Sequence, residues 1–256
     1  MTELVRVAVR VSETEREEAI ARLLAVVPQG LDERTSGNSI DLGIYVSRED
    51  SEAIRSSFPG STVEEVPLGW EDGWREFHHG VSAGGLWIGP PWEAGPDDPS
   101  AVVIDPGRAF GTGAHPTSRL CVELLARLSS RGSLLDVGCG SGVLAIAAVR
   151  LGFGPVVAID VDPVAVEVAG SNAAANGVRI ETGLADATLA RLPPADVVVA
   201  NIALDTVGRV LERADAPDVV TAGYLQSEQP AVSGWRSVTR LELDGWAADH
   251  FRRETV

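Results

Sequence analysis

The segment LLDVGCGSGVLAIAA, at residues 134–148, constrains the fold of this 256-residue chain more than any other. Gly138, Gly140 and Gly142 stand at alternate positions between a short apolar run and a strongly helix-forming run. This layout is typical of a strand, a tight turn and a helix N-terminus, with bare backbone facing a ligand. The spacing is G-x-G-x-G rather than the G-x-G-x-x-G of dinucleotide-binding folds. The sequence therefore predicts an α/β fold whose first turn binds a ligand without a pyrophosphate.

Two acidic residues flank this glycine turn. Asp136 stands two residues before Gly138, where its carboxylate can engage the turn backbone or a ligand's ammonium group. Asp160 ends the next apolar run, 22 residues beyond Gly138, near the spacing at which an acid meets ribose hydroxyls. The alternative is a glycine turn that merely packs a helix on a strand. Together the acids favour a nucleoside with a cationic amino-acid tail, and S-adenosyl-L-methionine is the expected cofactor.

Polar residues also follow the next two apolar stretches. Asp186 can accept from an adenine amino group or can be a solvated loop acid, and both interpretations stay open. Asn201 ends the buried run at 197–200 and can orient an amine nucleophile or contact the cofactor, so it is the candidate catalytic residue. The Asn-Pro-Pro-Tyr of amide-nitrogen methyltransferases is absent, which argues against glutamine methylation. Asp162, followed by a proline, is expected to cap the next helix.

The run DPGRAFGTGAHPTS, residues 105–118, is rich in glycines and hydroxyls and predicts a loop that folds over a bound ligand. A helix is expected to begin at Thr117 and Ser118 and to run through Leu128, with one hydroxyl as its cap. His115 has no second His or Cys at ligand spacing, so no metal site is predicted. The candidate cofactor contacts in this run are Phe110, Thr112, Thr117 and Ser118.

The N-terminal third predicts a separate, small domain of βαββαβ order, which fits a ferredoxin-like sandwich. The expected strands and helices cover residues 4–11, 13–27, 30–34, 39–46, 48–57 and 62–66, in that order. Ser12 is expected to cap the first helix. A linker helix is expected at 68–82, and a strand ending in a turn at 83–92. From residue 101 onward, alternating strands and helices predict a doubly wound parallel sheet, so the domains are 1–67 and 83–256.

The composition limits the partners. The net charge is −16, from 21 basic and 37 acidic residues. Such a surface repels phosphate backbones and attracts a basic protein, although simple solubility explains it equally well. No run approaches the ~18 apolar residues of a membrane span. The two cysteines lack metal-ligand spacing and are expected to be reduced thiols. We expect a cytoplasmic monomer that neither reads nucleic acid nor enters a membrane.

These segments together resemble the PrmA family, the bacterial methyltransferases of ribosomal protein L11. The segments that carry the resemblance are WEDGWREF at 70–77, LWIGPPWE at 86–93, residues 105–118, residues 134–148, VVAIDVDP at 156–163 and VVANI at 198–202. The resemblance implies a seven-stranded Rossmann-like methyltransferase sheet and a substrate-recognition role for the small domain. It also implies cofactor contacts at Ser118, Gly138, Asp160 and Asn201.

Two departures from the family pattern accompany this resemblance. Ser118 replaces the usual threonine but keeps the hydroxyl, and residues 212–218 lack the expected Lys-Pro-Gly-Gly turn. The leading hypothesis is methylation of lysine or α-amino groups of ribosomal protein L11, a basic protein. The alternatives are methylation of another protein or a small molecule, or a non-catalytic cofactor-binding module in ribosome assembly.

Overall fold

The structure is a computed structural model that describes residues 4–26, 31–36, 39–66, 79–93, 95–97, 99–105, 111–230 and 233–254. The chain divides into two compact units, Met1–Phe77 and His78–Val256. Each unit has its own sheet and its own core, so the two are described separately. Within the described residues, no helix combines the length and apolar character needed to cross a membrane.

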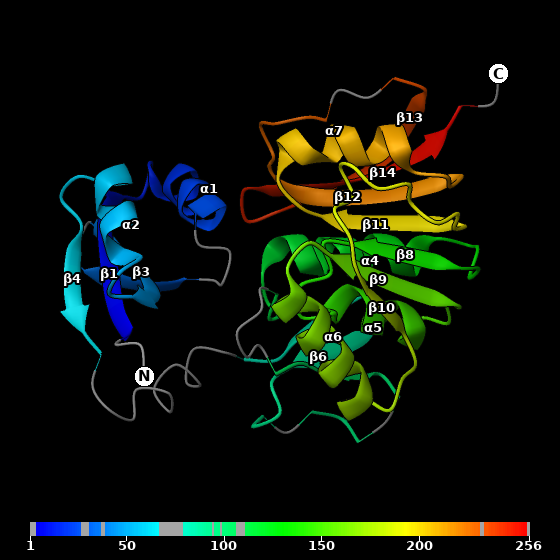
Figure 1. Cartoon of the computed structure of the whole chain (residues 1–256), viewed down its shortest axis with the longest axis horizontal. Coiled ribbons are helices and arrows are strands. Elements are labelled where there is room, and N and C mark those ends of the chain that lie inside the picture. The colour runs from blue at the N-terminus through cyan, green and yellow to red at the C-terminus, as the bar shows by residue number, and fades with distance from the viewer. Residues whose placement is uncertain are drawn as a thin grey trace. The chain divides into compact units, whose positions relative to one another are not determined.

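The N-terminal unit has the predicted βαββαβ order (Figure 1). Its elements are β1 (Leu4–Ser12), α1 (Arg16–Val26), β2 (Asp32–Ser36), β3 (Ser39–Ser47), α2 (Ser51–Ser57) and β4 (Thr62–Glu65). The strands form one antiparallel sheet in the order β2-β3-β1-β4. Apolar residues are buried at alternate positions of β3, and Leu23 of α1 and Ile54 of α2 are buried with them. This period of two turns one face of β3 to the core, whereas residues 5–9 of β1 are buried on both faces of the strand.

Both helices of this unit begin three residues later than predicted. Residues 13–15 form a turn before α1, and Ser12 ends β1. The Ser12 hydroxyl donates to the Glu15 carboxylate and caps no backbone amide of α1, so the predicted capping role is wrong. Before α2, Ser47 accepts a hydrogen bond from the backbone amide of Asp50 in a further turn. Ser and Asp side chains compete with the first helical turn in this way.

The expected linker helix at 68–82 is only partly testable, because residues 67–78 lie outside the described residues. Its last residues are not helical, since Val81–Ala83 forms strand β5. The strand predicted at 83–92 is present as β6 (Leu86–Gly89) and ends in a turn, but the first residues of that range end β5 and form the turn of an antiparallel hairpin between β5 and β6. Gly84 and Gly85 make its turn with φ of 58° and 79°, which a residue with a side chain rarely adopts. Strand β7 (Ala101–Val103) then pairs with β6 in parallel.

The large sheet of the second unit confirms the predicted α/β class. In chain order its elements are α4 (Pro116–Arg127), β8 (Leu134–Val137), α5 (Val143–Arg150), β9 (Val156–Asp160), α6 (Pro163–Ala175), β10 (Glu181–Leu184), β11 (Val197–Asn201), α7 (Leu204–Arg213), β12 (Asp218–Leu225), β13 (Trp235–Leu243) and β14 (Trp246–Arg253). The strand order is β10-β9-β8-β11-β12-β14-β13. The first five strands of that order are parallel, and the connection reverses direction between β8 and β11. Ligands bind at such a switch point.

The last two strands make the sheet mixed instead of wholly parallel. Strand β14 is antiparallel to β12, and β13 is antiparallel to β14. Asp244 and Gly245 join β13 to β14 with φ of 49° and 83°. An Asp-Gly pair with positive φ at both positions is typical of a tight hairpin turn. This hairpin closes the sheet beside β12, without the crossover helix that parallel pairing needs.

Candidate functional site

The glycine turn lies between β8 and α5 and has the geometry that its sequence predicts. Gly138, Gly140 and Gly142 all have positive φ, at 72°, 52° and 82°. A Cβ on Gly138 would lie 2.6 Å from the Ile202 side chain, and a Cβ on Gly142 would lie 3.0 Å from the Ala169 backbone. Only glycine therefore allows this turn to lie so close to the adjoining segments. The result is a bare backbone cradle at a helix N-terminus, which suits a ligand of small cross-section.

Asp160 connects this turn to the end of β9. Its Oδ2 accepts from the Gly140 amide at 2.9 Å, and its Oδ1 accepts from the Asp162 amide at 3.0 Å. Asp162 in turn accepts from the Val164 amide at 2.8 Å and caps α6, as predicted. An ionised carboxylate has about four acceptor positions, so Asp160 keeps acceptor capacity for a vicinal diol.

Asp136 lies beneath the turn and is fully buried. Its Oδ2 accepts from the Ala145 amide of α5 at 3.0 Å, while its Oδ1 has no hydrogen-bond partner among the described residues. Burial raises the pKa of Asp136 to about 7; the Ala145 amide opposes this shift and the nearby Asp160 charge adds to it. The backbone contact is thus to α5 and not to the glycine turn as predicted, and one oxygen stays unpaired.

The loop before α4 is fastened to the glycine turn. The Ser141 hydroxyl, fully buried, donates to the Gly111 carbonyl, which joins the two glycine-rich segments. The Thr112 hydroxyl accepts from the Ala114 amide at 3.3 Å and so supports the loop itself. Phe110 lies outside the described residues, as do its neighbours 106–109. The described part of the loop therefore lies beside the cradle.

Two asparagines that the sequence did not single out, Asn172 of α6 and its C-cap Asn176, hold the start of this loop. Asn172 is buried, accepts from the Asp105 amide at 3.2 Å and donates to the carbonyls of Asp105 (3.1 Å) and Ser141 (2.9 Å). Asn176 accepts from the Val103 amide at 2.8 Å and donates to its carbonyl. Their sequence signal is a pair of amides four residues apart, which share one helix face.

His115 begins α4, in place of the hydroxyls that were expected to cap it. Its Nδ1 accepts from the Thr117 amide at 3.3 Å and lies 2.8 Å from the Thr117 hydroxyl. Burial lowers the pKa of His115 to about 4, so the ring is neutral at pH 7 and Nδ1 is free to accept. The ring also meets Trp246 edge to face, with centroids 4.8 Å apart.

Asn201 is brought against the start of α4. Its amide nitrogen donates to the hydroxyls of Thr117 at 3.1 Å and Ser118 at 3.3 Å, and both hydroxyl residues are buried. Three of the predicted site residues therefore form one hydrogen-bonded group, although Asn201 lies more than 80 positions from the other two in sequence. Its amide oxygen accepts no hydrogen bond from the described residues and is left for a ligand.

The remaining candidates contribute less to this arrangement. Asp186 follows β10 and accepts from the Thr188 amide and hydroxyl, which together lower its pKa. Cys121 and Cys139 are free, and burial raises the pKa of both thiols. Among the described residues, no group of His, Cys, Asp and Glu could hold a metal ion. The site is therefore built from glycine backbone, two carboxylates, two hydroxyls and one amide.

Several known proteins are similar to this chain in sequence or in fold. Residues 13–248 match the family model for ribosomal protein L11 methyltransferase (PrmA). A ribosomal protein L11 methyltransferase from Actinobacillus pleuropneumoniae is 39% identical over 204 residues, which are 73% of this chain and 67% of that protein. One from Dechloromonas aromatica is 52% identical over 163 residues, covering 62% of this chain and 51% of that protein. The chain thus spans between about half and two thirds of these relatives.

A solved structure agrees with these sequence matches. The ribosomal protein L11 methylase from Lactobacillus delbrueckii subsp. bulgaricus has a TM-score of 0.61 and is 28% identical, covering 69% of this chain and all of that one. The family model spans both units described above and includes the glycine turn, Asp160 and Asn201. The chain belongs to the ribosomal protein L11 methyltransferase (PrmA) family.

Proposed function

We propose that this chain transfers a methyl group from S-adenosyl-L-methionine to amines of ribosomal protein L11. The observation that carries the proposal is the joining of Asn201 to Thr117 and Ser118 at the edge of the sheet that holds the glycine cradle. The acceptor is inferred from the family to which the chain belongs, whose model is described as ribosomal protein L11 methyltransferase. The acceptor amines are lysine side chains, α-amino groups, or both.

The residues of the cradle fit this cofactor, which supplies a methyl group activated by a positively charged sulfur. The backbone of the glycine turn, with positive φ at all three glycines and at the N-terminus of α5, would accommodate the amino-acid portion. Asp160, at the end of β9, holds the ribose hydroxyls with the acceptor capacity that its two amide contacts leave. The unpaired, buried Oδ1 of Asp136 is the candidate to balance the cationic tail. Asp186, which follows β10, is the candidate for the adenine amino group.

On the acceptor side, this chain orients an amine and excludes water. A lysine amine has a pKa of about 10.4 and must lose its proton before it attacks; an apolar pocket lowers that value. Asn201 fits the orienting role, because two buried hydroxyls fix its amide plane. His115 is not a general base, since Nδ1 already caps α4. Loss of the proton to water is sufficient.

The N-terminal unit is proposed to recognise the protein acceptor. Its βαββαβ order and its strand order β2-β3-β1-β4 support a ferredoxin-like domain that ends near residue 67. The methyltransferase domain then extends from about residue 79, earlier than the sequence predicts, because β5 belongs to it. With a net charge of −16, the chain attracts a basic protein more readily than nucleic acid. We expect a monomer that acts in the cytoplasm.

A mass measurement on intact ribosomal proteins tests this function. Ribosomes from cells with and without the chain are compared, and the strain without it is complemented with the wild-type or the Asn201→Ala form. L11 is expected to lose its methyl mass in the deletion strain and to regain it only with the wild-type form. Unchanged L11 with a mass difference on another protein would favour the alternative acceptor. No mass difference on any protein would favour a non-catalytic module.

A further inference from the structure

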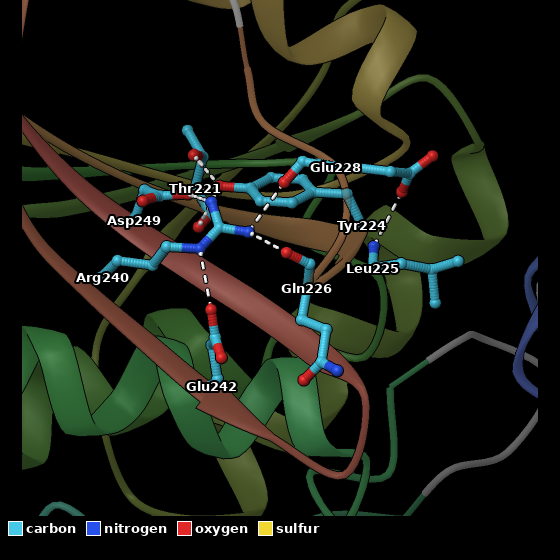
Figure 2. Close-up of polar contacts among 8 residues, drawn as sticks. All are labelled: Thr221, Tyr224, Leu225, Gln226, Glu228, Arg240, Glu242 and Asp249. Atoms are coloured by element: carbon cyan, nitrogen blue, oxygen red, sulfur yellow. Dashed lines mark hydrogen bonds and ion pairs between the residues drawn. The ribbon is translucent and has the colours of Figure 1, made fainter.

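A row of polar side chains crosses the three C-terminal strands. Thr221 of β12 pairs with Asp249 of β14, which pairs with Arg240 of β13, so the three lie side by side on one face. Asp249 is only 1% exposed. Tyr224 donates from its hydroxyl to Asp249 at 2.8 Å and is itself buried. Figure 2 shows the Arg240 guanidinium between Asp249 and the chain that follows β12.

Arg240 ties that following chain to the C-terminal hairpin. One terminal nitrogen donates to Asp249 at 2.9 Å, and the other donates to the carbonyls of Gln226 at 2.9 Å and Glu228 at 2.7 Å (Figure 2). The Gln226 amide donates to the Gly245 carbonyl at 2.8 Å. We call residues 225–228, the last residue of β12 and the three that follow it, the post-β12 segment. Its backbone is held by the Arg240 side chain of β13 and by the Gly245 carbonyl in the turn of the hairpin.

The post-β12 segment lies at the same sheet edge as Asn201. Asn201 pairs with Ala222 of β12, and a Cβ on the next residue, Gly223, would lie only 2.2 Å from the Ile202 carbonyl. The segment begins two residues later. The backbone of β12 therefore lies against the backbone that follows Asn201, just before the post-β12 segment begins.

A second line of contacts returns from the segment to Asn201. Leu225 pairs with Trp246, whose ring contacts His115. His115 accepts from Thr117, and Thr117 accepts from Asn201. The contacts form a closed circuit around the sheet edge where an amine must approach, and the post-β12 segment is part of that circuit.

We propose that Arg240 is a positioning residue for the acceptor. It touches no reacting atom; it holds the post-β12 segment and the adjoining Trp246 so that the acceptor entrance beside Asn201 keeps its shape. Arginine suits this task because its planar fork donates to a carboxylate and two carbonyls at once, which lysine cannot match. The proposal rests on the proposed methylation of L11.

The test compares Arg240→Lys with Arg236→Lys, a matched change on the same strand at an exposed position. Methylation of L11 is followed over a range of acceptor concentrations, and binding of S-adenosyl-L-methionine is measured by calorimetry. Hydrogen–deuterium exchange is recorded for the post-β12 segment and for α5 in both variants. The exchange measurement needs no acceptor and so is independent of the assigned substrate.

Arg240→Lys is expected to speed amide exchange in the post-β12 segment but not in α5. It should lower kcat/KM for L11 by about tenfold, through a higher KM, as the loss of one charge-assisted hydrogen bond would. The affinity for the cofactor should not change. Arg236→Lys should match the wild type throughout. Unchanged exchange, unchanged kcat/KM, or an equal loss of cofactor binding would overturn the positioning role. If Arg240→Lys speeds amide exchange as expected but the wild-type chain never methylates L11, the proposed function is overturned, and with it the role assigned to Arg240.

Discussion

At the scale of single residues, two carboxylates separated by 24 positions have different roles in the site. Asp160 is partly exposed and accepts from the glycine turn, whereas Asp136 is fully buried beneath it. The sequence places both at the carboxyl ends of strands, where either could meet a ligand. Burial distinguishes their surroundings, and it disfavours the charged form of Asp136.

Asp160→Ala is expected to weaken binding of S-adenosyl-L-methionine severely while the chain stays folded. The change removes the proposed ribose acceptor and the contact to Gly140. Calorimetric titration measures the affinity, and circular dichroism checks the fold. Asp162→Ala is the control: it removes only the cap of α6, which costs about 0.5–2 kcal/mol of stability. Affinity equal to that of the wild type would remove the ribose assignment.

Asp136 makes the stability of the chain depend on pH. Its pKa is raised from 3.8 to about 7 in the folded chain, so the folded state holds a proton more tightly than the unfolded state between those values. The free energy of unfolding should therefore fall as the pH rises from about 4 to about 7.

The Asp136→Asn variant tests this dependence, because asparagine keeps the shape and cannot ionise. Urea denaturation at about pH 5 and about pH 8 should show a fall in stability that is smaller in the variant by about 1–4 kcal/mol, since each pKa unit corresponds to about 1.4 kcal/mol. Identical pH profiles for the two proteins would show that this carboxyl is not the group responsible.

At the scale of elements, α6 fixes the loop that borders the cradle. The Asn172 side chain makes three hydrogen bonds, two to Asp105 and one to Ser141, whereas the Asn176 side chain bonds the backbone of Val103 and of Asn172. The loop and the glycine turn thus share one buried anchor.

Asn172→Ala is expected to destabilise the chain by about 1–3 kcal/mol, because it leaves buried backbone groups unpaired. It should also weaken cofactor binding, since Ser141 lies within the glycine turn. Asn176→Ala is the matched change and should lower stability with a smaller effect on cofactor affinity. Thermal denaturation and calorimetric titration of both variants measure the two effects; equal losses of affinity would argue against a special role for Asn172.

Sequence periodicity predicted most elements but missed both short hairpins of the second unit. The βαββαβ order and the central parallel strands follow from alternating and continuous apolar runs, which local sequence determines. The Gly84-Gly85 turn lies inside the range predicted as one strand, and the Asp244-Gly245 turn lies where only alternating strands and helices were expected. Turn chemistry at these pairs was the available signal.

At the scale of the whole molecule, the charge of −16 should affect how fast a basic acceptor arrives. Association steered by charge slows as salt screens it, with a Debye length of about 8 Å at physiological ionic strength. We expect kcat/KM for L11 to fall steeply with added salt while kcat changes little. An uncharged amine substrate is the control and should show no such fall; a salt-independent kcat/KM for L11 would exclude electrostatic steering.

The sequence by itself determined the class of fold, the glycine turn and the acids at its strand ends, because these depend on residue type and short spacing. Only the tertiary structure decided which of these residues meet. Asn201 reaches Thr117 and Ser118 across more than 80 positions, Asn172 holds Asp105 across 67, and Arg240 closes the C-terminal edge. Such contacts depend on how strands order themselves in the sheet, which no local pattern encodes. The tertiary structure also decided which side chains are buried, and burial raises the pKa of Asp136 and lowers the pKa of His115.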